Sequence, residues 1–264
     1  MKFFRGVRVR RRVRKSYRSR KGVRKAKKQS FAKKVLKVIR RQAENKVWIA
    51  YQANNNITTA SSSTFTNVSL MPTMSQGTGH SNRVGDDVHV VKAKITGVVN
   101  LLPYNSISNP TVGPLYVRMW VLSVKNMQNA QTLSTSTISS NFFETNGGSV
   151  GPQGNILDMC LSVNKQNFII HKVKTVLLES GATQGSTYYN SAGGSCGGSG
   201  RFSAPFSFDV TKHLGKLKFD DTSPVSPVNK NLFLAFQAVY ADGTALALTA
   251  AEYSYGYRVE FEDM

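Results

Sequence analysis

Most of this chain alternates between hydrophobic and polar residues with a period of two, the pattern of β-strands that bury one face. The clearest stretch is 253–261, where Tyr, Val or Phe occupies every second position and Ser, Gly, Arg or Glu lies between them. Residues 115–124 are apolar on both faces, which is typical of a strand inside a sandwich. Residues 88–101 also alternate, and the side chains expected to face the core are Val91, Ala93, Ile95, Val99 and Leu101.

Short strands and long polar connections account for the rest of the chain after residue 43, where we expect no helix. Further strands are predicted at 47–51, 64–70, 167–178, 201–210, 214–219 and 232–240. The connections, rich in Ser, Asn, Gly and Pro, are predicted at 54–63, 103–114, 126–152, 181–200 and 220–231. This pattern predicts an all-β fold, either a double-sheet sandwich or a barrel, with the jelly roll among the candidates.

The period changes in residues 30–43, where Ser30 can cap a helix. At helical spacing after it lie Phe31, Val35, Val38, Ile39 and Gln42, and Lys or Arg fills much of the remainder. We therefore predict a short basic amphipathic helix. Two other interpretations stay open, a frayed extension of the preceding segment and a helix that lies on a membrane surface.

The charges divide the chain more sharply than its hydrophobic pattern does. Twenty of the 35 Lys and Arg residues lie in residues 1–41, and no Asp or Glu does. Because the formal net charge is +21, this segment carries +20 and the remainder, with 15 basic and 14 acidic residues, carries +1. We expect residues 1–28 to be disordered alone, since dense like charges repel. The predicted domains are an arm, 1–45, and a globular part, 46–264.

An arm of this composition predicts binding to polyphosphate. Flexible cations can follow any phosphate backbone and release its counterions, so such binding depends steeply on salt. It carries no base code, because base readout needs side chains held at groove edges. The candidate nucleic-acid-binding residues are Arg5, Arg8, Arg10, Arg11, Arg12, Arg14, Lys15, Arg18, Arg20, Lys21, Arg24, Lys25, Lys27, Lys28, Lys33, Lys34, Lys37, Arg40 and Arg41. Runs such as 10–12 and 25–28 also have the composition of nuclear import signals.

Signals for secretion or membrane insertion are not expected. Arg5 follows Phe3 and Phe4 at once, so the apolar core of a signal peptide is missing. The longest apolar stretch, 232–241, has half of the ~20 residues that a membrane-spanning helix needs. Cys160 and Cys196 lie far apart in no metal or redox spacing, which favours a reduced intracellular compartment.

Catalytic signatures are missing from the sequence as well. We find no phosphate-binding loop of the form G-x-x-x-x-G-K-[ST] and no G-x-S-x-G turn. The four histidines, none at metal spacing, are His80, His89, His171 and His213. We therefore expect no enzyme, cofactor or metal, although a Ser/His/Asp triad of distant residues stays open. The doublets 86–87 and 220–221 leave open Ca²⁺ at contacts between subunits.

Several segments resemble a known family. Gln76-Gly77-Thr78-Gly79-His80-Ser81-Asn82-Arg83-Val84-Gly85-Asp86-Asp87-Val88 resembles a segment that precedes an early strand in capsid proteins of circular single-stranded DNA viruses, the circovirus-like group. Residues 168–174, 214–219 and 227–240 resemble later parts of those proteins, so the resemblance covers most of the chain in order. The long Gly-rich segment 181–200 and the mixing of Lys with Arg in the arm depart from the best-known circoviruses.

The resemblance implies a single jelly-roll β-sandwich of two four-stranded antiparallel sheets. It further implies a structural capsid protein, of which about 60 copies close an icosahedral shell around a single-stranded DNA genome. The implied partners are DNA, copies of the same chain, the nuclear import machinery of the host and a cell-surface receptor, and the implied locations are the virion and the host nucleus. Arg83, Gly85 and Asp86 are expected to fix a turn or a contact between subunits.

Two alternatives remain. Coat proteins of single-stranded RNA satellite viruses share the plan of a basic arm and a jelly roll. The second alternative is a ribosomal or chromatin protein with a basic tail, but such proteins usually carry basic surface on the globular part too. A globular part at +1 argues against it.

Overall fold

The computed structural model describes residues 45–57, 66–102, 113–125, 141–179, 201–243 and 249–263. The chain divides into two compact units, Met1–Arg41 and Gln42–Met264. All the described residues belong to the second unit, which is called the body below. The predicted helix over 30–43 and every candidate residue of the basic arm lie outside the described residues.

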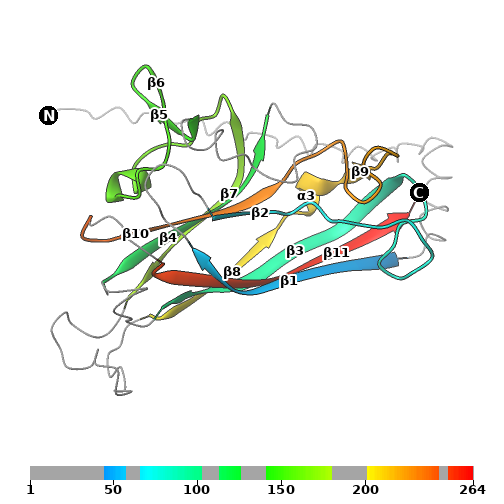
Figure 1. The fold of residues 1–264 in the computed structure, drawn as a ribbon, viewed down its shortest axis with the longest axis horizontal. Helices are drawn as coiled ribbons and strands as arrows, with labels where there is room; N and C mark the ends of the chain where they lie inside the picture. The colour runs from blue at the N-terminus through cyan, green and yellow to red at the C-terminus, as the bar shows by residue number, and fades with distance from the viewer. Residues whose placement is uncertain are drawn as a thin grey trace, which may run out of the picture. The chain divides into compact units, whose positions relative to one another are not determined.

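Two large antiparallel sheets form the sandwich of the body, and in Figure 1 they lie one above the other; a separate two-stranded sheet lies outside the sandwich. The first sheet contains, in spatial order, β1 (Asn45–Ile57), β11 (Ala251–Asp263), β3 (Asp87–Leu101) and β8 (Ser203–Asp209), with β9 (Lys216–Lys218) pairing one end of β3. The second sheet contains β2 (Thr66–Ser69), β10 (Phe233–Tyr240), β4 (Leu115–Val124) and β7 (Phe168–Leu178).

The order of these strands is that of a jelly roll. When the eight strands other than β5, β6 and β9 are numbered along the chain, one sheet reads 1-8-3-6 and the other reads 2-7-4-5. Successive strands thus cross from one sheet to the other at every step except one, which gives the two Greek keys of a double-sheet jelly roll. The predicted all-β jelly-roll sandwich is confirmed. The first sheet differs from the expected four strands only by the short β9.

The main core fills the space between the sheets. Along β11 the buried positions are the odd ones, so the alternation in the sequence is the alternation between core and surface. Tyr253 stacks on Phe236 of the opposite sheet with 4.2 Å between ring centroids, and Tyr257 meets Trp48 of β1 edge to face. Aromatic pairs in these arrangements add to the burial of apolar area. The Tyr253–Phe236 pair joins the two sheets, and the Tyr257–Trp48 pair joins neighbouring strands of the first sheet.

A second apolar cluster lies on the other side of the second sheet. Residues 141–167, with β5 (Phe143–Thr145), β6 (Gly148–Val150) and the 3-10 helix η1 (Ile156–Met159), supply aromatic side chains that cover it. Phe142 packs at 5.4 Å from Trp120 of β4 and at 5.1 Å from Phe168 of β7, measured between ring centroids. This cover explains why every residue of β10 is buried.

The structure corrects several local predictions. Val91 was expected in the core but is 44% exposed, because the pairing with β11 passes from Lys92 to Val90 and leaves Val91 as a bulge. Residues 54–57 belong to β1 rather than to a loop, and β5 and β6 lie in a predicted connection. After residue 43 the described chain also contains two short helical turns, η1 and α3 (Thr211–Leu214), which are too short to leave a periodic pattern.

Candidate functional site

The chain enters the described body at β1, four residues after Arg41, the last cation of the arm. Lys46 is 3% exposed, and its Nζ donates to the carbonyl oxygen of Asn82 at 2.9 Å and pairs with Asp263 Oδ2 at 2.9 Å. A buried lysine is tolerated only when it is paired and hydrogen-bonded. Lys46 therefore ties the first strand to the loop 76–86 and to the last strand.

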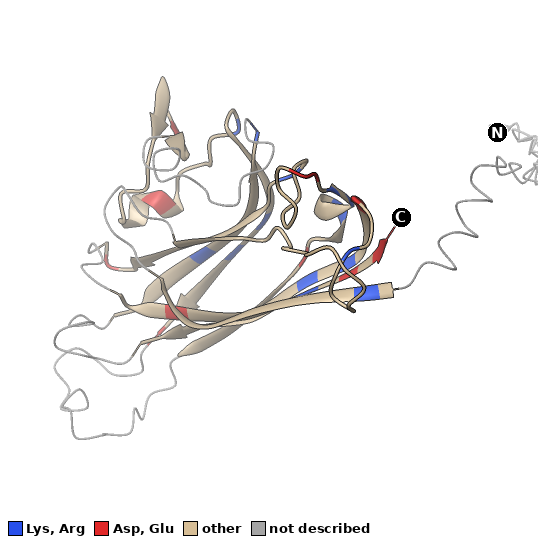
Figure 2. Cartoon of the chain, turned by 45° about the vertical axis from the view of Figure 1, so that its right-hand side comes forward, with Lys and Arg blue, Asp and Glu red and all other residues tan. Residues whose placement is uncertain are grey.

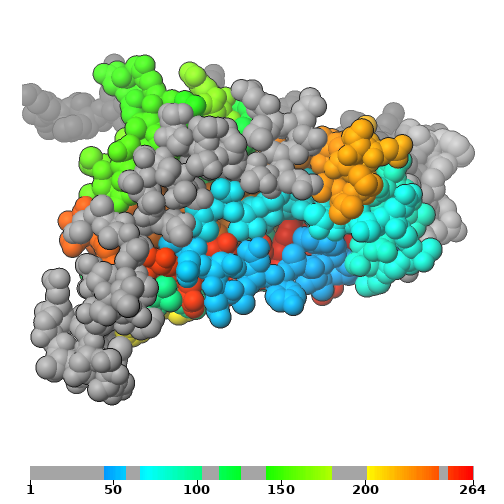
Figure 3. All heavy atoms as spheres, viewed as in Figure 1, coloured from blue at the N-terminus to red at the C-terminus, as the bar shows by residue number. Residues whose placement is uncertain are grey.

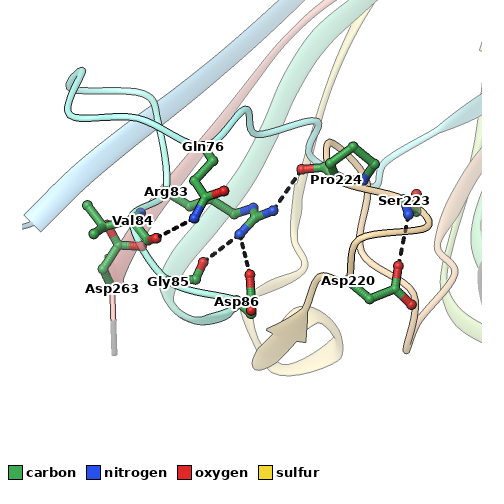
Figure 4. A network of polar contacts seen from close by, with 9 residues as sticks. All are labelled: Gln76, Arg83, Val84, Gly85, Asp86, Asp220, Ser223, Pro224 and Asp263. Atoms are coloured by element: carbon green, nitrogen blue, oxygen red, sulfur yellow. Dashed lines mark hydrogen bonds and ion pairs between the residues drawn. The ribbon is translucent and has the colours of Figure 1, made fainter.

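Arg83 lies at the centre of a junction between this loop and the segment 219–225 (Figure 4). Its side chain is 2% exposed. Its Nη1 donates to the carbonyl oxygen of Gly85 at 2.7 Å and to Asp86 Oδ1 at 2.9 Å, and its Nη2 donates to the carbonyl oxygen of Pro224 at 2.8 Å. The guanidinium also lies 4.5 Å from the ring centroid of Phe219, within the range of a cation–π contact.

Other polar contacts hold the two loops around Arg83. The backbone N–H of Val84 donates to Asp263 Oδ2, and Gln76 Nε2 donates to the carbonyl oxygen of Val84, both at 3.1 Å. On the second loop, Asp220 Oδ1 accepts the backbone N–H of Ser223 at 2.8 Å. Figure 4 shows these groups converging from three separate parts of the chain.

The contacts of Arg83 are internal to the chain, whereas Asp86 is 71% exposed and is open to a further partner. We propose that Arg83 and Gly85 fix this turn. The expected contact between subunits at Asp86 stays a prediction. Charged residues of both signs lie in the backbone at the end of the body where β11 ends (Figure 2).

A second polar group lies where β7 meets α3. The hydroxyl of Ser123 donates to the carbonyl oxygen of Asn231 at 2.7 Å and lies 2.9 Å from His171 Nε2. Because the hydroxyl proton is engaged by a carbonyl, the imidazole is the donor to Ser123 and does not act as its base. No activated serine results, so this pair gives no support to the triad that the sequence left open.

His171 also stacks on His213 of α3, with 4.0 Å between ring centroids. Burial, and secondarily the neighbouring His213, lowers the pKa of His171 to about 4. Burial, together with Lys172 and Lys230, lowers the pKa of His213 as well. Lys230 Nζ donates to the carbonyl oxygens of His213 and Leu214 at 3.1 and 2.6 Å. Both imidazole rings are therefore neutral at pH 7, and they meet where β7 lies against α3.

Asp158 is a fully buried carboxyl group in the segment that covers the second sheet. Its Oδ2 accepts the backbone N–H groups of Gln153 and Gly154 at 2.8 Å and the side-chain amide of Gln237 at 2.5 Å. Burial raises its pKa against the opposing effect of these hydrogen bonds. No sequence motif marks Asp158, His171 or His213, because their partners are distant in the chain.

The described residues hold no group of three or more His, Cys, Asp or Glu placed to bind a metal ion. Asp86 pairs with Arg83, and Asp87 pairs with Lys216 at 2.7 Å, so two of the four carboxylates considered for Ca²⁺ have cationic partners within the chain. Ca²⁺ at contacts between subunits stays a prediction. Cys160 is exposed and unpaired in this part of the chain. Among these residues, no helix is long and apolar enough to cross a membrane.

Comparisons with known proteins yield one weak structural likeness. No family model matches the chain, and no curated protein matches it. Among solved structures, the chain is similar to one of Desmodium yellow mottle tymovirus, with 8% sequence identity over 84% of this chain and 87% of that one. The TM-score is 0.32, so we draw no functional argument from this likeness. The strand order by itself defines the fold class of the body as an all-β jelly roll. In the sequence, a polycationic segment precedes this body.

Proposed function

We propose that this chain is a structural capsid protein without enzymatic activity, whose copies close a small icosahedral shell and package single-stranded nucleic acid. The observation that carries the proposal is the division of charge, +20 on residues 1–41 and +1 on the remainder, which folds as a jelly roll. A near-neutral body can meet copies of itself without repulsion, and a cationic arm neutralises phosphate.

The proposed shell has about 60 copies, the smallest closed icosahedral assembly. About 60 arms supply roughly 1,200 cations, which neutralise on the order of a thousand phosphates. That suits a genome of one to a few kilobases with small ions as the remaining counterions. We propose DNA as the cargo, and single-stranded RNA is the alternative that the experiment below distinguishes.

The test compares three full-length chains, the wild type, a chain in which the arm cations are replaced by Gln, and a matched chain in which residues 1–41 are scrambled. Particles are counted by negative-stain microscopy, and their cargo is measured by the ratio of absorbance at 260 and 280 nm after nuclease treatment. Since neutralisation needs charge and no base code, the scrambled arm is expected to package as the wild type does, and the Gln arm is expected to form shells with little cargo.

Digestion of the extracted cargo with DNase and with RNase separates the two kinds of genome. A wild-type chain that remains a monomer at moderate salt would contradict the proposed shell. A Gln arm that packages normally would contradict the proposed role of the arm. Nuclear import of the chain, with an arm mutated at 25–28 as the control, tests the proposed passage through the host nucleus.

A further inference from the structure

The outer face of the first sheet, which points away from the second sheet, carries an exposed aromatic residue with no packing role in the described body. Tyr51 is 81% exposed, more than any other large apolar side chain in this part of the chain. It lies on β1, ten residues after Arg41, so it is within about 35 Å of the last arm cation along the chain. Figure 3 shows β1 running along the surface of the body.

The residue beside Tyr51 in the sheet is a glycine that the described fold does not require. Gly256 is the direct partner of Tyr51 on β11, and a Cβ built on it would meet nothing within 4 Å. Gly97 on the next strand differs, because its Cβ would lie 2.5 Å from Phe206 Cζ. Glycine weakens the interior of a strand, and it occurs at bulges, at bends and where a ligand or another backbone approaches closely. Because Gly256 has no side chain, the backbone beside the Tyr51 ring is exposed.

The same row of the sheet continues with small hydroxyl side chains. Gly256 pairs with Thr96 of β3, and Thr96 pairs with Ser207 of β8. Directly paired residues point to the same face, and Gly256, Thr96 and Ser207 are all exposed. Across the sheet, this row therefore presents the ring of Tyr51, the exposed backbone of Gly256 and the hydroxyl groups of Thr96 and Ser207. It combines a stacking surface with groups that can form hydrogen bonds to the edge of a base.

Cations occupy the adjacent row. Arg258 and Lys94 are direct partners on β11 and β3, and both are exposed. Like charges placed opposite each other destabilise a sheet unless anions lie nearby. Glu260 bonds Arg258 at 3.1 Å and Asp209 lies opposite Lys94, so the face is close to neutral. The features of this face that favour a ligand are the ring of Tyr51 and the exposed backbone of Gly256. Arg258 and Lys94 lie where they can contact one phosphate.

We propose that this face binds one unpaired base of single-stranded nucleic acid, stacked on Tyr51 over Gly256, with the attached phosphate at Arg258 and Lys94. This inference rests on the proposed packaging function. Aromatic rings on a sheet surface bind unpaired bases in this way, with little sequence preference, because every base has a flat face. The body then holds one base with its phosphate, and the arm holds the other phosphates.

The experiment measures the affinity of the full chain for a labelled 12-nucleotide oligothymidylate and for a matched oligomer without bases, over a range of salt concentrations. Tyr51→Ala is expected to weaken binding of the oligothymidylate about tenfold at every salt concentration, and to leave the baseless oligomer unaffected. Tyr51→Phe keeps the ring and stays within about twofold. Ile49→Ala, at an exposed neighbour without a ring, is the matched control and binds as the wild type does.

Gly256→Val separates binding from folding. The introduced valine side chain meets open space, and valine favours strands, so the midpoint of unfolding is expected to stay unchanged or to rise. The same side chain covers the backbone on which the base would lie, so the oligothymidylate is expected to bind about tenfold more weakly. If both variants bind like the wild type, and the wild type shows steep salt dependence, the stacking site is wrong and the packaging function stands. A wild type without salt dependence contradicts the packaging function itself. Loss of particles at unchanged oligothymidylate affinity would make this face a contact between copies and would overturn the inference.

Discussion

Replacing Arg83 by Ala removes the central brace of the junction between two loops and should unfold the body at much lower denaturant. Three hydrogen bonds from a charged donor are lost, at 2.7, 2.8 and 2.9 Å, together with the contact to Phe219. Each such bond contributes about 1.5–3 kcal/mol, but the losses are not additive. The substitution leaves the carbonyl oxygens of Gly85 and Pro224 without their donor, at about 1–3 kcal/mol for each buried acceptor left unpaired. With the lost packing on Phe219, we expect the free energy of unfolding to fall by about 3–5 kcal/mol.

Two matched variants show which of these contacts matters. Arg83→Lys keeps the charge but cannot bridge Gly85 and Pro224 at once, so we expect an intermediate loss of about 2 kcal/mol. Asp86→Ala removes an ion-pair partner that is 71% exposed, and exposed pairs contribute about 0–1 kcal/mol. Urea unfolding of the full chain, followed by Trp fluorescence, measures all three.

A loss below about 1 kcal/mol for Arg83→Ala would refute this account of the junction, since a buried network cannot be dispensable. Particle yield should fall in parallel with stability, while the affinity of the arm for phosphate and its salt dependence stay at the wild-type values. An Asp86→Ala chain that is as stable as the wild type but forms no particles would instead identify Asp86 as a contact between subunits.

Three further perturbations test the interior. Because the pKa of His171 is about 4, below its ordinary value, neutral His171 stabilises the fold above pH 6.5, and this contribution is lost as the pH falls towards 4. Solvent screening limits the loss of unfolding free energy to about 1–2 kcal/mol. In urea unfolding at pH 7 and 4.5, the His171→Gln chain should not show this loss. The raised pKa of Asp158 means that its charge opposes folding at pH 7, so Asp158→Asn should unfold at the same or a higher urea concentration, and a large destabilisation would contradict this cost of the charge. Gly97→Ala should cost about 1–3 kcal/mol by overpacking against the carbonyl oxygen of Ser254 and the ring of Phe206, whereas Gly256→Ala should leave the thermal midpoint unchanged.

The positions of most strands could be predicted from the sequence, because period-two alternation is a local property. β3, β4, β7 and β10 begin and end within one residue of the predicted bounds. Errors arose where a tertiary contact overrides the local pattern. The bulge at Val91 turns a predicted core residue outward. The segment with β5 and β6 has too few alternating positions to look like strands, although its aromatic residues Phe142 and Phe143 pack on part of the second sheet.

The candidate sites differ in how far the sequence could reach. Arg83 was singled out through a resemblance to a family, yet nothing in the sequence placed Pro224, 141 positions later, against its guanidinium. His171 and His213 had no spacing that suggested a pair, and they meet because β7 and α3 lie at the same edge of the sandwich. The arm residues are a prediction from charge alone and lie outside the described residues.

By itself the sequence determined two properties of this protein, the separation of a +20 segment from a +1 remainder and the all-β character of that remainder. Both are sums over neighbouring residues, so no fold is needed to compute them. Only the tertiary structure decided which strands pair, that Arg83 is buried, and that the ring of Tyr51 lies beside the bare backbone of Gly256, some 200 residues later in the chain. Such juxtapositions depend on strand register, which packing of the whole core sets and no local pattern encodes.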